Sequence, residues 1–262
     1  MTLASHSVGS GPPLLLVNGY AATGADWDPT FVELLAASHR VICPDNRGLG
    51  GSELGDGELT VEAMAADLEA LLDELEVERT ALAGWSMGGF VAQRLARRVP
   101  ERVTALALIA TDPGGPDVVA AEPAVWQQLT DRSGSAREQA SRLIPLLFPP
   151  ALAPAIDAQF GDLIAAGRAA MSADALAAQE RAMEGWHQDG VGDPHGMIPP
   201  TLVIHGEEDV VIPAANAEPL AAHWPGARIE LIAGAAHAVM AQEPQRVAAA
   251  IDELTGPKAL TK

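Results

Sequence analysis

The chain has 262 residues, and its acidic residues outnumber its basic residues by 35 to 16, which gives a formal net charge of -19. This charge opposes binding to nucleic acid and to anionic membranes, and no apolar run approaches the roughly 18 residues that span a bilayer. The N-terminus has no basic segment followed by an apolar one, so we expect a cytoplasmic protein. The single cysteine, Cys43, excludes an internal disulfide and a multi-thiolate metal site.

Short apolar runs alternate with stretches of helical periodicity along most of the chain. Apolar runs of this length, bounded by turn residues, are typical of parallel strands buried on both faces. Their alternation with helices predicts right-handed crossovers and a mostly parallel sheet flanked by helices. The expected strands are 14–17, 40–43, 80–83, 103–109, 201–204 and 228–232, and the expected helices are 28–37, 60–75, 89–98, 213–223 and 244–254.

The alternation stops between residues 112 and 200, where clusters of Pro and Gly frame helical segments and no strand pattern occurs. The expected helices there are 122–131, 136–148, 151–166 and 173–187. An all-helical insertion between two parallel strands predicts a cap over the carboxyl edge of the sheet, where open α/β sheets bind their ligands. The alternative is a peripheral helical decoration. We therefore expect a core formed by residues 1–112 and 199–262, with a helical cap at 113–198.

The pentapeptide Gly84-Trp85-Ser86-Met87-Gly88 lies between an expected strand and an expected helix. This context favours a nucleophile elbow, in which a strained turn exposes the serine hydroxyl, over a structural turn rich in glycine. A serine nucleophile needs a general base and a carboxylate that orients it. Asp209 and His237 each follow an expected parallel strand, so they should meet Ser86 at one sheet edge. Asp112, at the end of another strand, is the rival for the acid.

Five segments together resemble the α/β-hydrolase fold: LLLVNGYAATGADW, VICPDNRGLGGS, LAGWSMGGFVAQRLA, TLVIHGEEDVVIP and IAGAAHAVMAQEP. The resemblance covers nearly the whole chain outside the helical insertion and implies that the cap follows the sixth strand. It is strongest to cap-bearing serine esterases, enol-lactone hydrolases and cofactor-free perhydrolases. Members usually begin with one or two antiparallel strands, for which only residues 2–8 are available here.

Acyl transfer requires two preorganised donors for the oxyanion. One should be the N–H of Met87, the residue after the nucleophile. The resemblance implies that the other is the N–H of Tyr20, because the family usually has His-Gly-x where this chain has Asn18-Gly19-Tyr20. Asn18 is the clearest departure from the family pattern. The Tyr20 ring could line the acyl pocket, hydrogen-bond substrate or pack under the cap.

Relatives that open epoxides or displace halides use an aspartate at the elbow, so Ser86 indicates acyl chemistry instead. We expect hydrolysis of a small to medium, largely apolar carboxylic ester or lactone through an acyl-enzyme, with a small-molecule partner and neither cofactor nor metal. The alternatives are peroxide-dependent perhydrolase or haloperoxidase chemistry, carbon-carbon bond hydrolysis and, remotely, a ligand receptor without turnover. Most apolar residues of the cap should hold its helices together. The candidate substrate-binding residues are Trp85, Trp126, Phe148 and Trp186.

Overall fold

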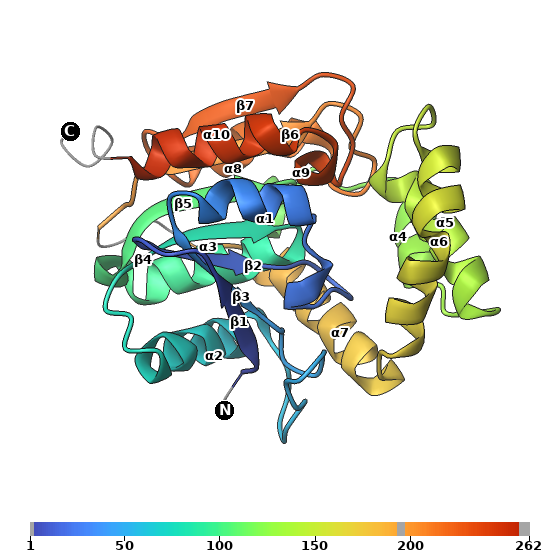
Figure 1. Ribbon diagram of the computed structural model, residues 1–262, viewed down its shortest axis with the longest axis horizontal. Helices are drawn as coiled ribbons and strands as arrows, with labels where there is room; N and C mark the ends of the chain where they lie inside the picture. Colours follow the sequence, from blue (N-terminus) through green and yellow to red (C-terminus); the bar gives the residue numbers. More distant parts are fainter. Residues whose placement is uncertain (1–2, 193–196, 257–262) are drawn as a thin grey trace.

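The computed structural model of the protein describes residues 3–192 and 197–256 (Figure 1). Its centre is a seven-stranded sheet with the spatial order β1-β3-β2-β4-β5-β6-β7. In the described chain, β1 runs antiparallel to β3 and the other neighbouring strands are parallel, which confirms the expected sheet. The strands are β1 (Ser5–Val8), β2 (Pro13–Val17), β3 (Arg40–Pro44), β4 (Thr80–Trp85), β5 (Val103–Ile109), β6 (Thr201–Gly206) and β7 (Arg228–Ile232). The N-terminal edge strand is therefore present, as β1.

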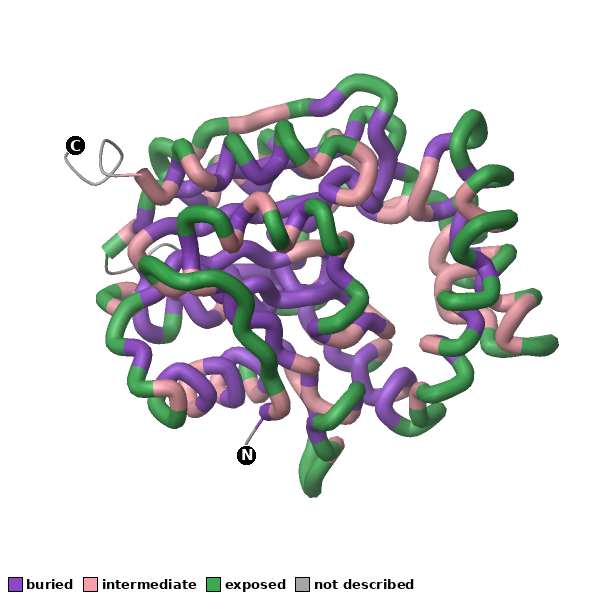
Figure 2. The backbone as a smooth tube through the Cα atoms, in the orientation of Figure 1, coloured by how far each residue is buried: buried purple, intermediate pink, exposed green. Residues whose placement is uncertain are grey.

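Two hydrophobic cores lie on opposite faces of the sheet because successive strand residues point to opposite sides. On β2, Leu15 and Val17 enter one core, whereas Leu14 and Leu16 enter the other. Figure 2 shows the buried trace running through the central strands, with exposed positions on the outer sides of the surrounding helices. The sheet is thus a rigid platform whose carboxyl edge can hold side chains in fixed positions.

Helices cover both faces of this platform. The helices α2 (Val61–Glu74), α3 (Met87–Arg98) and α8 (Ala217–Ala222) contribute to one core, and α1 (Pro29–Ala36), α9 (Val239–Gln242) and α10 (Pro244–Thr255) contribute to the other. Asp28 and Thr60 cap α1 and α2 with their side-chain oxygens, as hydrogen-bonding residues at helix N-termini commonly do. The four-residue α9 was not predicted, because a single turn carries no periodicity. Short 3₁₀ turns are η1 (Gly24–Asp26), η2 (Pro100–Arg102), η3 (Gly115–Asp117) and η4 (Ala214–Asn216).

Four helices occupy the predicted insertion between β5 and β6: α4 (Pro123–Thr130), α5 (Ala136–Leu147), α6 (Ala153–Ala169) and α7 (Ala173–Asp189). Figure 1 shows α4, α5 and α6 standing beside the sheet, while α7 leads back to it. Residues of α7, among them Met183 and Trp186, join a core of the sheet. We expected the insertion after the sixth strand, but it follows the fifth, because only β1 precedes β2. Residues 193–196 of the predicted cap lie outside the described chain.

None of the helices in the described ranges combines the length and the apolar character that a membrane-spanning segment requires.

Candidate active site

Ser86 lies in a strained turn between β4 and α3. Its backbone has φ 56° and ψ -126°, a conformation that non-glycine residues adopt only when their surroundings impose it. The Ser86 N–H donates to the Ile109 carbonyl (2.9 Å), and the Ser86 carbonyl accepts from the Gly89 N–H and the Thr111 hydroxyl (2.8 Å each). These bonds tie the turn to the end of β5. The helix begins at Met87, two residues before the expected start.

The elbow needs glycine on both sides of Ser86 because backbone segments approach closely there. A Cβ on Gly88 would overlap the Val17 carbonyl oxygen at the end of β2, and a Cβ on Gly84 would overlap the Gly88 carbonyl oxygen. The first turn of α3 therefore packs directly against the neighbouring strand. Met87 is the first residue of α3, so its N–H lies at the helix N-terminus, where the helix dipole favours negative charge.

Asp209 and His237 meet at the carboxyl ends of β6 and β7. The Oδ2 atom of Asp209 lies 2.8 Å from Nδ1 of His237, and their side chains are only 0% and 3% exposed. The other carboxylate oxygen, Oδ1, accepts from the N–H groups of Val211 (2.8 Å) and Ile212 (3.0 Å). The carboxylate is therefore fixed by its own loop, with one oxygen free to orient the imidazole.

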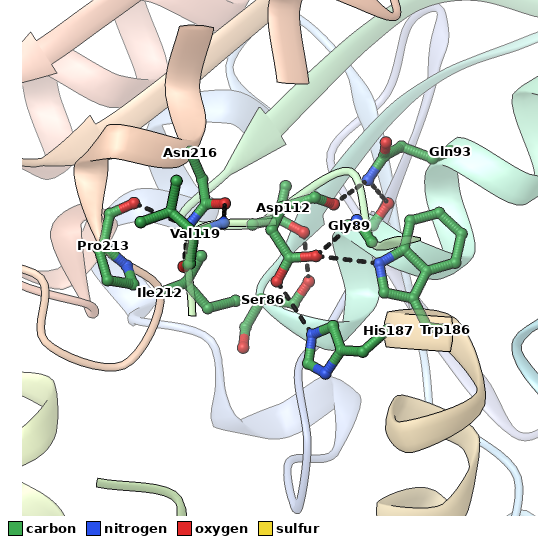
Figure 3. Close-up of polar contacts among 12 residues, drawn as sticks. Ser86, Gly89, Gln93, Asp112, Val119, Trp186, His187, Ile212, Pro213 and Asn216 are labelled. Carbon is green, nitrogen blue, oxygen red and sulfur yellow. Dashed lines mark hydrogen bonds and ion pairs between the residues drawn. The ribbon is translucent and has the colours of Figure 1, made fainter. Parts of the chain in front are cut away.

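Asp112, the rival acid, faces a different histidine. Its Oδ2 atom lies 3.2 Å from Nε2 of His187 on α7, and its Oδ1 atom accepts from the Trp186 indole N–H at 3.1 Å (Figure 3). Asp209, and not Asp112, is the carboxylate that hydrogen-bonds His237 among the described residues. The geometry thus favours the Asp209 assignment.

The loop after β2 lies against the elbow, where the second oxyanion donor was expected. A Cβ on Gly19 would be 3.1 Å from the Ser86 Cβ. The Asn18 side chain accepts from the Gly19 N–H (2.9 Å) and donates to the Thr23 carbonyl (2.7 Å), while Asn46 donates to the Asn18 carbonyl (2.9 Å). Asn18 therefore orders this loop and occupies the Gly19 N–H, so the next N–H, that of Tyr20, remains the candidate donor.

The helix α7 holds the same loop from the cap side. The Tyr20 hydroxyl donates to Glu180 (2.6 Å), and the Ala21 N–H donates to Gln179 (3.0 Å). Burial, together with the Glu180 carboxylate, raises the pKa of Tyr20 above its usual value, so the phenol stays protonated at neutral pH. Ala21 has φ 54°, a strained value for alanine. The helix α7 thus stabilises the conformation of the loop that carries the candidate oxyanion donor.

A cavity of about 270 Å³ lies between the sheet edge and the cap, and Ser86, His237 and Tyr20 line it. Of the candidate substrate-binding residues, Trp85 and Trp126 also line this cavity, whereas Phe148 and Trp186 do not. The Trp186 side chain instead stacks on Phe90, with ring centroids 5.2 Å apart and an interplanar angle of 14°. The prediction that Phe148 and Trp186 bind substrate therefore has no support from the cavity lining.

Two parts of the cavity wall were missed by the sequence analysis. The segment 118–121 follows β5 without regular structure, and it is held by Asn216, whose side chain accepts from the Val119 N–H (2.8 Å) and donates to the Val119 carbonyl (2.9 Å) (Figure 3). His187 also lines the cavity. No periodic pattern marks the segment, and a histidine on a cap helix gives no signal of its own.

The chain belongs to the α/β-hydrolase fold family, whose model matches residues 12–244. It is 29% identical to 2-hydroxymuconate semialdehyde hydrolase from Pseudomonas sp. (strain CF600), over 95% of this chain and 88% of that protein. It is also 29% identical to a putative non-heme chloroperoxidase from Synechocystis sp., over 89% of this chain and 87% of that protein.

Among solved structures, a thermophilic esterase from Thermogutta terrifontis is 30% identical, with a TM-score of 0.71 and coverage of 96% of this chain and 92% of that chain. Similarity to proteins described as hydrolase and esterase supports hydrolase activity for this chain. The relatives differ in the reaction that their names describe, so they do not identify a substrate.

Proposed function

We propose that this protein hydrolyses a small to medium, largely apolar carboxylic ester or lactone through an acyl-enzyme intermediate. The proposal rests on the arrangement of Ser86, His237 and Asp209 at the cavity. Ser86 lies in a strained elbow, His237 is hydrogen-bonded by the buried Asp209, and both Ser86 and His237 line the same apolar space. This set of groups suits acyl transfer to a serine hydroxyl.

In the proposed reaction, His237 takes the proton from the Ser86 hydroxyl as Oγ attacks the carbonyl carbon. The oxyanion accepts hydrogen bonds from the N–H groups of Tyr20 and Met87, and its collapse releases the alcohol, which receives the proton from His237. A water molecule, deprotonated by His237, then attacks the acyl group and releases the acid as Ser86 regains its proton. Asp209 holds the imidazole in the tautomer and orientation that both steps require.

The cavity wall supports the proposed substrate class. Most of its lining residues are apolar, and the described ones include neither lysine nor arginine. An apolar cavity with few polar groups favours an uncharged ligand that it can largely enclose. A cavity of about 270 Å³ is too small to enclose a polymer, and a highly charged thioester would leave charged groups without partners in this space. The apolar residues are Tyr20, Trp85, Phe90, Val118, Val119, Ala120, Ala121, Val125, Trp126, Leu129, Leu147, Met183, Val211 and Ile212.

The proposal is tested by assaying nitrophenyl esters from acetate to decanoate, together with a γ-lactone, with wild type, Ser86→Ala and Ser7→Ala. Ser7 lies on the exposed strand β1, so its variant is the control for a serine substitution. We expect turnover with an optimum at a medium acyl length, and a fall in kcat of at least about 10³-fold in Ser86→Ala alone.

Acetate with peroxide and a vinylogous diketone are assayed in parallel, because they report perhydrolase and carbon-carbon hydrolase activity. Turnover of esters that persists in Ser86→Ala would refute the proposed nucleophile. A folded wild type that turns over only the peroxide or the diketone substrates would refute ester hydrolysis as the function.

A further inference from the structure

The cavity contains a second carboxylate-histidine pair, which the proposed reaction does not use. Asp112 follows β5 and His187 lies on the cap helix α7, with Oδ2 and Nε2 3.2 Å apart, and both residues line the cavity beside Ser86 (Figure 3). Thr111, the residue before Asp112, donates to the Ser86 carbonyl. The pair is therefore adjacent to the proposed nucleophile, and together with Ser86 and His237 it interrupts a mostly apolar wall.

The Asp112 carboxylate is firmly oriented. Its side chain is 3% exposed, and Oδ1 accepts from the Gly114 N–H (2.8 Å) and the Trp186 indole N–H (3.1 Å). Because Trp186 is stacked on Phe90, these donors fix the plane of the carboxylate and direct Oδ2 toward His187. A carboxylate oxygen can accept two hydrogen bonds, and His187 is the one partner of Oδ2 among the described residues.

The polar position that Asp112 leaves open is an acceptor. His187 occupies one lone pair of Oδ2, and the second lone pair has no partner among the described residues. A ligand group that satisfies this oxygen must therefore donate a hydrogen bond. A carboxylate on the ligand would be repelled by Asp112, and no described lysine or arginine on the wall would offset that repulsion.

We propose that Asp112 and His187 form a substrate-binding subsite for a hydroxyl group carried by the ester away from the reacting carbonyl. The inference rests on the proposed ester hydrolysis and narrows its substrate class to hydroxylated esters or lactones. Because Ser86 and His237 are engaged with the reacting ester in the proposed reaction, a polar anchor away from them fixes the orientation of the ligand. A protonated amine could also donate, but it would lose far more hydration on entering this cavity.

The test compares kcat/KM for matched esters that differ by one hydroxyl. The acyl arm uses the nitrophenyl esters of hexanoic acid and of its ω-hydroxy derivative, and the alcohol arm uses the butyrate esters of hexanol and of hexanediol. We expect the kcat/KM of wild type to be about tenfold or more higher for the hydroxylated ester in one of the two arms. A hydrogen bond to a charged acceptor has an effect of this size. The monoester of hexanedioic acid should be a worse substrate than either acyl ester.

Two variants change the pair in different ways. In Asp112→Asn, the amide oxygen satisfies the Gly114 and Trp186 donors, so an NH₂ group replaces the acceptor Oδ2, while His187→Phe removes the ring nitrogens and leaves Oδ2 in place. We expect the hydroxylated-to-plain ratio of kcat/KM to fall about tenfold in Asp112→Asn and to be kept in His187→Phe, because Oδ2 still accepts from the ligand hydroxyl. The matched control is Asp117→Asn, since Asp117 pairs with His223 (3.1 Å) outside the cavity wall, and it should leave the ratio unchanged.

A structural role for the pair predicts a different result. If Asp112 and His187 only join the cap to the core, both esters lose activity equally in Asp112→Asn and the ratio stays constant, which would overturn the subsite. A wild-type preference for the monoester that carries a carboxylate, or no preference in either arm, would also overturn it.

A failure of ester hydrolysis itself is recognised separately. If wild type turns over no ester, calorimetric titration of Ser86→Ala with hexanediol and with hexanol still tests the subsite. At least tenfold tighter binding of the diol, lost on adding Asp112→Asn, would support the subsite without the hydrolytic function. Equal affinities would refute it.

Discussion

The two carboxylate-histidine pairs line one cavity but are held in different ways. Asp209 and His237 follow adjacent strands of the sheet, are almost fully buried and lie 2.8 Å apart. The second pair joins the core residue Asp112 to the cap helix residue His187, which is 38% exposed, at 3.2 Å. The first pair is therefore built on the sheet, whereas the second pair joins the core to α7.

This difference extends to the groups that support each carboxylate. The Oδ1 atom of Asp209 is satisfied by N–H groups of its own loop, at Val211 and Ile212. The Oδ1 atom of Asp112 depends in part on Trp186, which belongs to the same cap helix as His187. The Asp209–His237 pair is thus held by residues of the core, whereas the Asp112–His187 pair is shared between the core and α7.

The largest expected effect distinguishes the two carboxylates. Asp209→Asn should lower kcat for nitrophenyl butyrate by on the order of 10³- to 10⁴-fold, because the amide can donate toward Nδ1 and so favours the wrong tautomer of His237. Asp112→Asn should lower it by no more than about tenfold, since this residue does not contact His237. Steady-state kinetics of both variants, with thermal unfolding as the check on folding, measures the difference. The reverse order of effects would assign the orienting role to Asp112.

A smaller effect is expected where the cap contacts the proposed oxyanion hole. The fully buried Gln179 accepts from the N–H of Ala21, the strained residue that follows Tyr20. Gln179→Ala should lower kcat by about tenfold and change KM by less than about threefold, because a displaced oxyanion donor weakens binding of the transition state more than that of the substrate. The measurement is kcat and KM on the preferred nitrophenyl ester.

Tyr20→Phe is the matched control for this substitution. It removes the hydroxyl that donates to Glu180 and keeps the backbone N–H, so kcat should fall by less than about threefold. A larger loss in Tyr20→Phe than in Gln179→Ala would mean that the side chain, and not the backbone of the loop, makes the important contribution.

The core residues of the site could be predicted from sequence because parallel strands bring their carboxyl ends to one edge. Ser86, Asp209 and His237 each follow such a strand, and the structure places Ser86 and His237 on one cavity and Asp209 against His237. Their catalytic roles remain predictions. The parallel sheet and its flanking helices were predicted on the same physical basis, since burial on both faces produces continuous apolar runs.

The cap side of the site could not be predicted in the same way. Of the three candidate substrate-binding residues in the predicted cap, Trp126 lines the cavity, whereas Phe148 and Trp186 do not. A helix with apolar residues on more than one side does not reveal which side faces a cavity. The recognition of His187 required knowing that Asp112 lies opposite it, which is a tertiary contact between residues 75 positions apart.

The smallest expected effect concerns His205, a fully buried residue on β6 whose pKa is influenced by Asp209 and Asp112, one carboxylate from each pair. Burial lowers its pKa below the usual 6.5, and the carboxylates only partly offset this. The unfolded chain therefore binds a proton near pH 6.5 that the folded protein does not. The free energy of unfolding should be greatest above that pH and fall with acidification, by at most about 1.4 kcal/mol per pH unit from this residue.

His205→Gln removes the titrating ring and keeps a donor for the Thr111 carbonyl, which lies 2.9 Å from His205 Nε2. Urea unfolding of wild type and His205→Gln across the range from neutral to mildly acidic pH measures the difference, with His6→Gln on the exposed strand β1 as the control. We expect the acid slope to be shallower in His205→Gln and unchanged in His6→Gln. Parallel profiles for all three proteins would mean that protonation of His205 does not lower the free energy of unfolding. The core around His205 would then tolerate a buried positive charge.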